Sequence, residues 1–202
     1  MQPTTPRQPA TLAFNAPEKV ANWRPLVNWL LALPHYVVLY ALRILSEVIA
    51  FISWFAIVFT GKMPEQFANI QAMYMRYEIR TYSFAAFLRE EYPPFSFGMT
   101  PSDSGEDPRV RVDFVPQLSE RNRLTVAFRI ILVIPQVIVL FFLGVAAAVV
   151  TLIALFAVLF TGHWPEGMRT FVLDVLRWYL RVQTYLTLLT DEYPPFALTT
   201  SA

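Results

Sequence analysis

Two long apolar stretches dominate the pattern of hydrophobic and polar positions along the chain. Across residues 26–60 the only charged residues are Arg43 and Glu47, and across residues 130–161 there are none. A helix rises about 1.5 Å per residue and the hydrocarbon core of a bilayer is about 30 Å thick, so about 20 apolar residues suffice to cross it. Both stretches exceed that length. The pattern predicts a protein inserted in a membrane.

Each apolar stretch is followed by a segment that carries a narrow polar stripe at helical spacing. In residues 165–190 the stripe consists of Thr170, Asp174, Arg177, Arg181 and Thr184, and in residues 65–90 of Asn69, Arg76, Arg80 and Ser83. An arginine in the middle of a lipid-exposed span costs about 2.5–3.5 kcal/mol. We therefore expect two amphipathic helices that lie at the membrane interface rather than across the bilayer.

The two halves of the chain align at a fixed offset. The motif FTGKMPE at 59–65 matches FTGHWPE at 160–166, and EYPPF at 91–95 matches EYPPF at 192–196. Every matched pair differs by 101 in number, which indicates a duplication. We expect a first membrane repeat over 1–98, a linker over 99–108 and a second membrane repeat over 109–202. The linker is rich in small, polar and turn-forming residues, so we expect it to be exposed.

A short alternating segment precedes each copy, at Thr11–Phe14 and Val110–Phe114, and the two are expected to pair as strands. Together with the proline in each apolar segment, the Phe-Thr-Gly-x-x-Pro motif, the Arg-x-x-x-Arg helix and Tyr-Pro-Pro-Phe, they resemble the bacterial membrane family catalogued as domain of unknown function 4389. The resemblance covers residues 10–98 and 109–198. It implies a membrane protein and brings no activity or active-site residues with it.

Two arrangements suit each apolar segment. In the first, the segment is a hairpin that turns near Arg43 in one copy and near Gly144 in the other, and each arm barely crosses the bilayer. In the second, Pro34 or Pro135 kinks the chain and one helix runs on to the Thr-Gly motif. The hairpin is preferred, because it keeps every charge but Arg43 and Glu47 on one side of the membrane.

The expected fold is thus all-α integral membrane, a tandem repeat of a helical hairpin plus an amphipathic helix, with a short β segment before each copy. The basic residues outside the apolar segments predict that their side is cytoplasmic. The expected location is a bacterial plasma membrane, crossed several times, with the termini and the linker in the cytoplasm.

Composition narrows the chemistry further. Hydrophobic residues make up 55% and charged residues 15%, and there is no cysteine to form a disulfide or a thiolate metal site. The net charge of +1 says nothing about partners, but the absence of a block of like charges argues against a nucleic-acid partner. His35 and His163 occupy non-equivalent positions and neither has metal-ligand spacing. We expect no enzyme, no metal and no cofactor.

The motifs that recur in both copies have structural explanations. Gly61 and Gly162 suit the left-handed position after a helix, and Pro64 and Pro165 suit the start of the next one. Tyr-Pro-Pro-Phe stops a helix and places aromatic rings near the membrane boundary.

The arginine pairs are the one candidate site. Arg76 with Arg80 and Arg177 with Arg181 are spaced four apart, on one helical face, and two guanidinium groups can clamp a phosphate. We expect these four to bind anionic lipid headgroups. The alternatives are that they snorkel to the headgroups or pair with Asp174 and Glu78, or that they line a polar transport path. The expected function is a non-catalytic membrane scaffold or accessory subunit, with membrane lipids and a larger membrane complex or homo-oligomer as partners. The alternative is a small oligomeric transporter or channel component whose polar stripes line a path.

Overall fold

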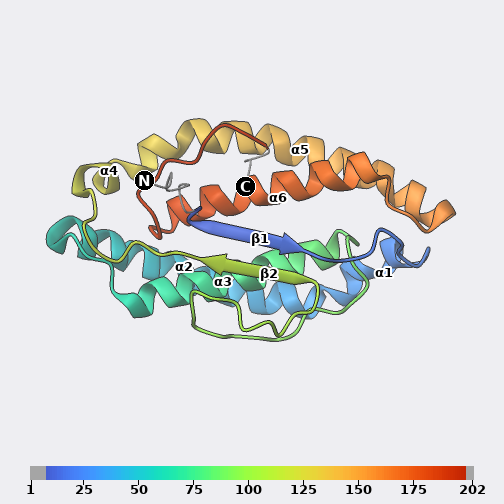
Figure 1. Cartoon of the computed structure of the whole chain (residues 1–202), viewed down its shortest axis with the longest axis horizontal. Coiled ribbons are helices and arrows are strands. Elements are labelled where there is room, and N and C mark those ends of the chain that lie inside the picture. Colours follow the sequence, from blue (N-terminus) through green and yellow to red (C-terminus); the bar gives the residue numbers. More distant parts are fainter. Residues whose placement is uncertain (1–7, 199–202) are drawn as a thin grey trace, which may run out of the picture.

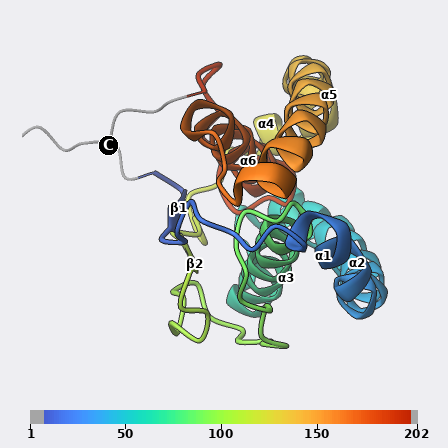
Figure 2. The same ribbon diagram turned by 90° about the vertical axis from the view of Figure 1, so that its right-hand side faces the viewer.

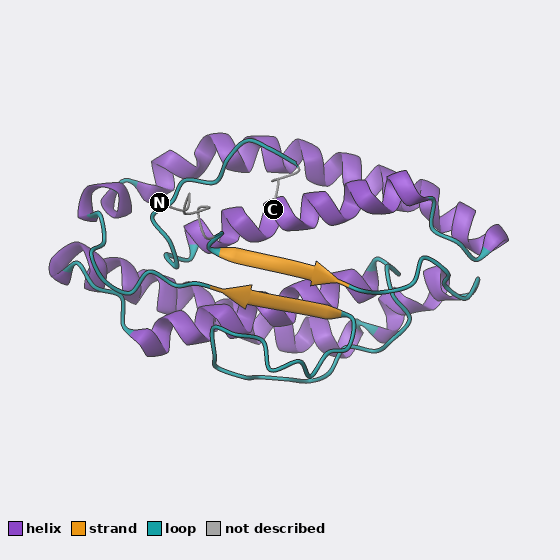
Figure 3. Ribbon diagram, in the orientation of Figure 1, coloured by secondary structure: helices purple, strands orange, loops and turns teal. Residues whose placement is uncertain are grey.

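Six helices and one two-stranded sheet make up the part of the chain that the computed structural model describes, residues 8–198. In chain order they are β1 (Ala10–Phe14), α1 (Arg24–Leu31), α2 (Leu33–Thr60), α3 (Glu65–Ala85), β2 (Val110–Phe114), α4 (Arg123–Ala127), α5 (Arg129–Thr161) and α6 (Glu166–Leu186). The four long helices and both strands run along the long axis of the molecule (Figures 1 and 3). The fold is mostly helical, as expected.

Each long apolar segment is one continuous helix, so the preferred hairpin arrangement is wrong. Helix α2 has 28 residues and α5 has 33. Arg43 and Glu47 form an ion pair of 2.9 Å one turn apart, which supports a helix instead of breaking it. Gly144 lies inside α5, where the helix tolerates it. Among residues 8–198, α2 and α5 are the two helices whose length and apolar composition suffice to cross a membrane.

The prolines act differently in the two copies. In the first copy, the helix is interrupted at Ala32, between α1 and α2. Pro34 lies in the first turn of α2, where the N–H that proline lacks would have no partner within the helix. In the second, the break falls earlier, at Phe128, and α5 continues through Pro135. The expected interruption before a single long helix is therefore present in both copies, but Pro135 does not mark it.

The Phe-Thr-Gly-x-x-Pro-Glu motif is helix punctuation, as predicted. Gly61 and Gly162 have left-handed φ values of 71° and 69°, and each closes the preceding helix through its N–H. Pro64 and Pro165 are extended and immediately precede α3 and α6. The identical geometry at both positions supports the duplication.

Alanine at either glycine is expected to destabilise the fold by about 1–2 kcal/mol, because a Cβ clashes with the carbonyl oxygen in the left-handed region. The loss is expected to be larger for Gly162→Ala. Its Cβ would lie 2.9 Å from Asn22 Oδ1, and the Asn22 side chain is held by a 2.9 Å bond to Leu159 O.

At Gly61 the nearest atom, 3.1 Å away, belongs to the flexible side chain of Arg123, which can move aside. The free energy of unfolding from chemical denaturation in detergent measures the difference. Gly98→Ala is the control, since a Cβ there meets nothing within 4 Å. Unfolding of Gly162→Ala at the same denaturant concentration as this control would contradict the prediction.

Equivalent segments of the two copies run in opposite directions. α2 and α5 are antiparallel in space, as are α3 and α6 (Figure 1). The strands pair antiparallel, with Leu12 opposite Val112, which confirms the predicted pairing. The copies are therefore related by an approximate two-fold rotation across the long axis.

The chain crosses the length of the molecule through β2, so the second copy begins at the opposite end from the first (Figure 1). The helices of each copy return to the end of the molecule at which they began, but the two copies begin at opposite ends (Figure 1). The repeats are inverted because the strands that precede them pair antiparallel. The two termini, 1–7 and 199–202, lie outside the residues that the structure describes.

The elements form three layers, which the end-on view shows most clearly (Figure 2). The sheet lies on one side, α3 and α6 lie in the middle, and α2 and α5 lie away from the sheet. Helix α3 is buried on all sides across residues 71–81, so the face expected to meet headgroups is covered. In contrast, α2 and α5 expose large apolar side chains along their length.

Candidate functional site

The four arginines predicted to bind lipid do not share an open surface. Arg76, Arg80 and Arg181 are 5%, 1% and 6% exposed. Arg177 is partly exposed and pairs with Asp174 at 2.7 Å. The expected placement of both pairs toward headgroups is corrected, because three of the four side chains are buried and all four have partners within the protein.

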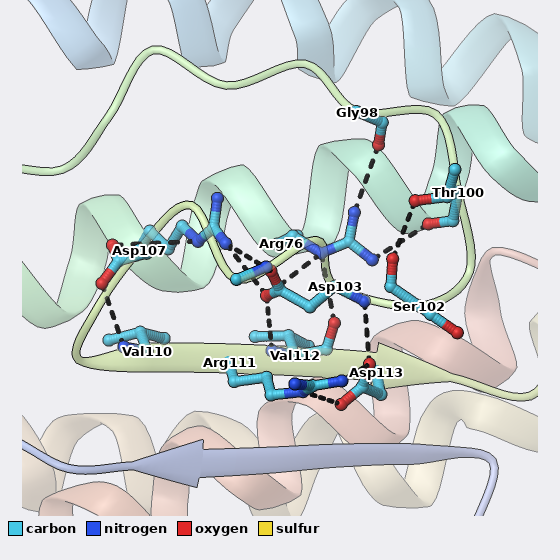
Figure 4. Close-up of polar contacts among 12 residues, drawn as sticks. Arg76, Gly98, Thr100, Ser102, Asp103, Asp107, Val110, Arg111, Val112 and Asp113 are labelled. Carbon is cyan, nitrogen blue, oxygen red and sulfur yellow. Dashed lines mark hydrogen bonds and ion pairs between the residues drawn. The ribbon is translucent and has the colours of Figure 1, made fainter.

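Arg76 and Arg80 of α3 hold the segment between the repeats against that helix. Figure 4 shows Arg76 beside Asp103 and Gly98. Arg80 Nη2 donates to both carboxylate oxygens of Asp103, at 2.8 and 2.9 Å. Arg76 lies 3.4 Å from the same carboxylate and donates to the carbonyl oxygens of Gly98, Thr100 and Val112. Asp103 is buried, so the linker is an ordered part of the fold at this point.

A second aspartate of the same loop, Asp107, makes a similar contact with another arginine. Arg89 Nη1 donates to Asp107 at 2.5 and 2.6 Å. Burial opposes the charged carboxylate, but the hydrogen bond and charge of Arg89 hold the pKa of Asp107 below its usual range. The same two carboxylates accept from the backbone N–H groups of Val112 and Val110, at 2.9 and 3.0 Å. They close the outer edge of β2.

The linker prediction is therefore only partly right. Residues 104–106 are exposed, as expected, whereas Asp103 and Asp107 are buried. The composition of 99–108 is typical of a solvated turn, and it does not show that two of its side chains meet arginines of a distant helix.

At one pair of equivalent positions, the two copies use different residues to bind equivalent backbone carbonyl oxygens. Asn28 Nδ2 donates to the carbonyl oxygens of Phe84 and Arg89, at 3.0 and 3.2 Å. Arg129, 101 positions later, donates to those of Tyr185 and Thr190, at 2.7 and 2.6 Å. Unlike Asn28, Arg129 is charged and buried, so the second copy also supplies a carboxylate that pairs with it.

That partner is Asp191, whose Oδ1 lies 2.6 Å from both Arg121 and Arg129. This cluster of Arg121, Arg129 and Asp191 was not predicted from the sequence. Its only signal in the sequence is Arg129, which stands where the first copy has Asn28.

The histidine of the first copy is likewise structural. His35 Nδ1 lies 2.7 Å from the Tyr77 hydroxyl, and at the equivalent positions Gln136 Oε1 accepts from Trp178 Nε1 at 2.9 Å. Within residues 8–198 no group of three His, Cys, Asp or Glu residues is arranged to hold a metal ion.

A pocket of about 500 Å³ lies where the two repeats meet, and we refer to it as the junction pocket. Its lining from α2 includes Arg43, Glu47, Phe51 and Trp54, from α3 Tyr74, Glu78 and Tyr82, from α6 Tyr179 and Gln183, and from α5 Arg129 and Ile130. Its volume is within the range of pockets that hold small ligands.

Glu78 is the buried acid of the junction pocket, at 3% exposure. Its Oε1 accepts from the Tyr74 hydroxyl at 2.8 Å, and the hydroxyls of Tyr82 and Tyr179 lie near the carboxyl. No donor among the described residues completes a hydrogen bond to Oε2. Burial raises the pKa of Glu78 above its usual range, against the effect of the three hydroxyls.

The position of Glu78 coincides with the junction of the duplication. Its equivalent in the second copy, 101 positions later, is Tyr179, which lines the same pocket. The pocket thus lies near the approximate two-fold axis, but only the first copy supplies the acid. At its rim Arg43 and Glu47 are 67% and 65% exposed and paired with each other.

The fold and its sites define a class of protein: a duplicated, mostly helical chain with two helices apolar enough to enter a membrane and a pocket with one buried acid at the junction of the copies. The chain belongs to the family described as "Domain of unknown function (DUF4389)", whose model matches residues 22–96 and 123–197. The two matched ranges also differ by 101 in number, so the family unit occurs as two tandem copies. No curated protein and no solved structure matches the chain.

Proposed function

We propose that this protein is a non-catalytic membrane scaffold or accessory subunit that lies in the plane of one membrane leaflet. In this arrangement α2 and α5 are embedded through their exposed apolar faces, and the sheet faces water. The observation that carries the proposal is the placement of the two apolar helices on the side of the molecule away from the sheet (Figure 2).

The apolar side is formed by large side chains that no other element of the described chain covers. On α5 they include Phe141, Phe142, Val145, Leu152, Phe156 and Phe160, and on α2 Val37, Tyr40, Phe51 and Phe59. A contiguous apolar surface of this extent marks a membrane or protein contact. The length of α5, 33 residues without an internal charge, favours lipid.

Exposed charged residues on the sheet favour an arrangement in which the helices do not cross the bilayer. β2 runs alongside the middle of the long helices (Figure 1) and carries Arg111, whose side chain is 56% exposed, together with Asp113. Helices that cross would bring this pair to the depth of the hydrocarbon core, where an arginine costs about 2.5–3.5 kcal/mol. Helices in the plane of the leaflet leave the pair in water.

The approximate two-fold axis favours the same orientation. When it is parallel to the membrane normal, both copies present the same apolar face to one leaflet. Crossing helices would require the sheets of several copies to surround water, which is the arrangement of the alternative function, an oligomeric transporter or channel component. The orientation of α5 therefore distinguishes the two functions.

Spin labels on α5 are expected to report equal depths along the helix. The chain has no cysteine, so Phe142→Cys and Phe160→Cys each give one label at an exposed position. The two sites are separated by about 27 Å along the axis at 1.5 Å per residue. In liposomes, collision with oxygen and with a water-soluble nickel complex measures depth by electron paramagnetic resonance.

The in-plane arrangement predicts depths that differ by less than about 10 Å, the width of a helix. A label at Arg111→Cys is the matched control and is expected to be as accessible as a label in water. A Phe142 label at the bilayer centre with a Phe160 label at its surface, and a protected Arg111 label, would establish crossing helices and favour the transporter.

A further inference from the structure

The junction pocket opens between the two embedded helices. Its buried residues, Tyr74 and Glu78, come from the middle layer, whereas Arg43, Phe51 and Ile130 of α2 and α5 line it and are exposed. The floor of the pocket therefore lies toward the sheet and its mouth lies on the apolar side. In the orientation proposed above, on which this inference rests, a molecule enters the pocket from the lipid.

The pocket has the acid Glu78 at its floor and the Arg43–Glu47 ion pair at its mouth. At the floor, Glu78 has one carboxylate oxygen that no donor of the described chain satisfies. At the mouth, the Arg43 guanidinium bonds Glu47 through Nε alone, at 2.9 Å. A buried acceptor without a donor costs about 1–3 kcal/mol, which a ligand with an N–H group would offset.

We propose that the junction pocket binds the headgroup of a lipid with a primary ammonium and a phosphate, the ammonium at Glu78 and the phosphate at Arg43. The direction of entry matches the lipid. In a leaflet the ammonium of such a headgroup is its outermost part and the acyl chains point to the bilayer centre. A headgroup that rises into the pocket therefore reaches the floor with its ammonium and passes the mouth with its phosphate.

The walls of the pocket suit this occupant. Three tyrosines, at positions 74, 82 and 179, surround the carboxyl, and aromatic rings attract ammonium groups. The rings of Tyr82 and Tyr179 are 6.3 Å apart between centroids. At the mouth, Phe51 and Ile130 provide apolar contacts for the first carbons of the chains. An anionic headgroup without an amine would leave Glu78 unsatisfied.

Lipid retention tests the proposal without any substitution. The full chain is placed in phosphatidylcholine nanodiscs that contain equal fractions of phosphatidylethanolamine and phosphatidylglycerol, and bound lipid is measured by native mass spectrometry. We expect one phosphatidylethanolamine to be retained about tenfold over either competitor. Equal retention of phosphatidylglycerol, or of phosphatidylcholine, whose ammonium has no N–H, would overturn the proposal.

Glu78→Gln is expected to reduce the preference to less than twofold, because the amide keeps the size of the side chain and loses its charge. The matched control is Glu106→Gln, an exposed carboxylate in the linker, which should retain the wild-type preference. A wild-type preference in Glu78→Gln would overturn the assignment. Equal binding of soluble phosphoethanolamine would overturn the assignment of a lipid.

The failure of this inference is distinguishable from failure of the proposed orientation. Equal label depths along α5 with no lipid preference would overturn the pocket assignment alone. Unequal depths, measured in the same nanodiscs, would overturn the orientation first.

Discussion

Asp103→Asn is expected to lower the free energy of unfolding by about 3–5 kcal/mol, the usual cost of removing one partner from a buried ion pair. The Asp103 side chain is fully buried and lies 2.8 Å from Arg80 and 3.4 Å from Arg76. The asparagine keeps the shape of the side chain but leaves two buried guanidinium groups without their shared carboxylate. It also weakens the cap on the Val112 N–H at the edge of β2.

Urea denaturation in a mild detergent, followed by circular dichroism, measures this loss. Arg111→Gln is the matched control, since its ion pair with Asp113 is largely exposed and such pairs contribute about 0–1 kcal/mol. Release of the linker is also expected to accelerate trypsin cleavage after Arg109. If Asp103→Asn unfolds within about 1 kcal/mol of the control, the buried ion pairs do not hold the linker.

The parts of the fold that the sequence predicts best are those that local chemistry determines. Gly61 and Gly162 end helices because only glycine adopts the left-handed conformation without strain, and this needs no knowledge of distant residues. The strand pairing and the duplication were also visible, since equivalent segments keep a fixed offset. Both features follow from residue type and order.

The errors arise where a partner lies far along the chain. The stripe of Arg76 and Arg80 predicts a polar helix face, but not that Asp103 and Asp107 cover it from the following loop. A charged pair inside an apolar run suggested a turn at Arg43, although its four-residue spacing is equally that of a helical ion pair. In both cases composition identified the charges and not their partners.

The junction pocket shows the same limit for the candidate site. Glu78 lies between Arg76 and Arg80 in the sequence, two positions from each. In a helix, residues two apart lie on different faces, so Glu78 points away from Arg76 and Arg80 toward the second copy. The pocket forms only when α2, α3, α5 and α6 come together.

Divergence between the copies created the asymmetry of the pocket. Tyr179 and Gln183 of the second copy stand where the first has Glu78 and Tyr82. Two-fold packing of identical copies would have brought two acids together at the junction, where like charges repel. A tyrosine in the second copy removes the repulsion and places a hydroxyl near the remaining carboxyl.

The contribution of Glu78 to the stability of the wild-type protein is expected to fall as pH rises, and Glu78→Gln is expected to remove that dependence. Burial raises the pKa of Glu78 in the folded state. The folded protein therefore binds this proton more tightly than the unfolded chain, whose carboxyl has a pKa of about 4.3. The stabilisation that the Glu78 proton contributes is fully present below the unfolded-state pKa. It is lost as pH rises through the raised pKa of the folded state, by up to about 1.4 kcal/mol per pH unit.

The groups that face Glu78 do not obscure its titration. Burial raises the pKa of Tyr74, Tyr82 and Tyr179, so all three stay neutral below pH 10, and Arg43 stays charged.

Unfolding by urea is measured at intervals between pH 4 and pH 9 in a detergent without amine groups, which keeps the proposed ligand out of the pocket. Subtracting the wild-type free energy from that of Glu78→Gln cancels the other titrating groups, and we expect the difference to rise with pH in favour of the variant. Glu106→Gln should give a difference that does not rise in favour of the variant, because hydrogen bonds with Ser96 and Ser104 lower the pKa of that exposed carboxylate instead of raising it. A flat difference for Glu78→Gln would mean that its carboxyl titrates in the folded protein as it does in the unfolded chain, and the junction pocket would then hold an ordinary, hydrated acid.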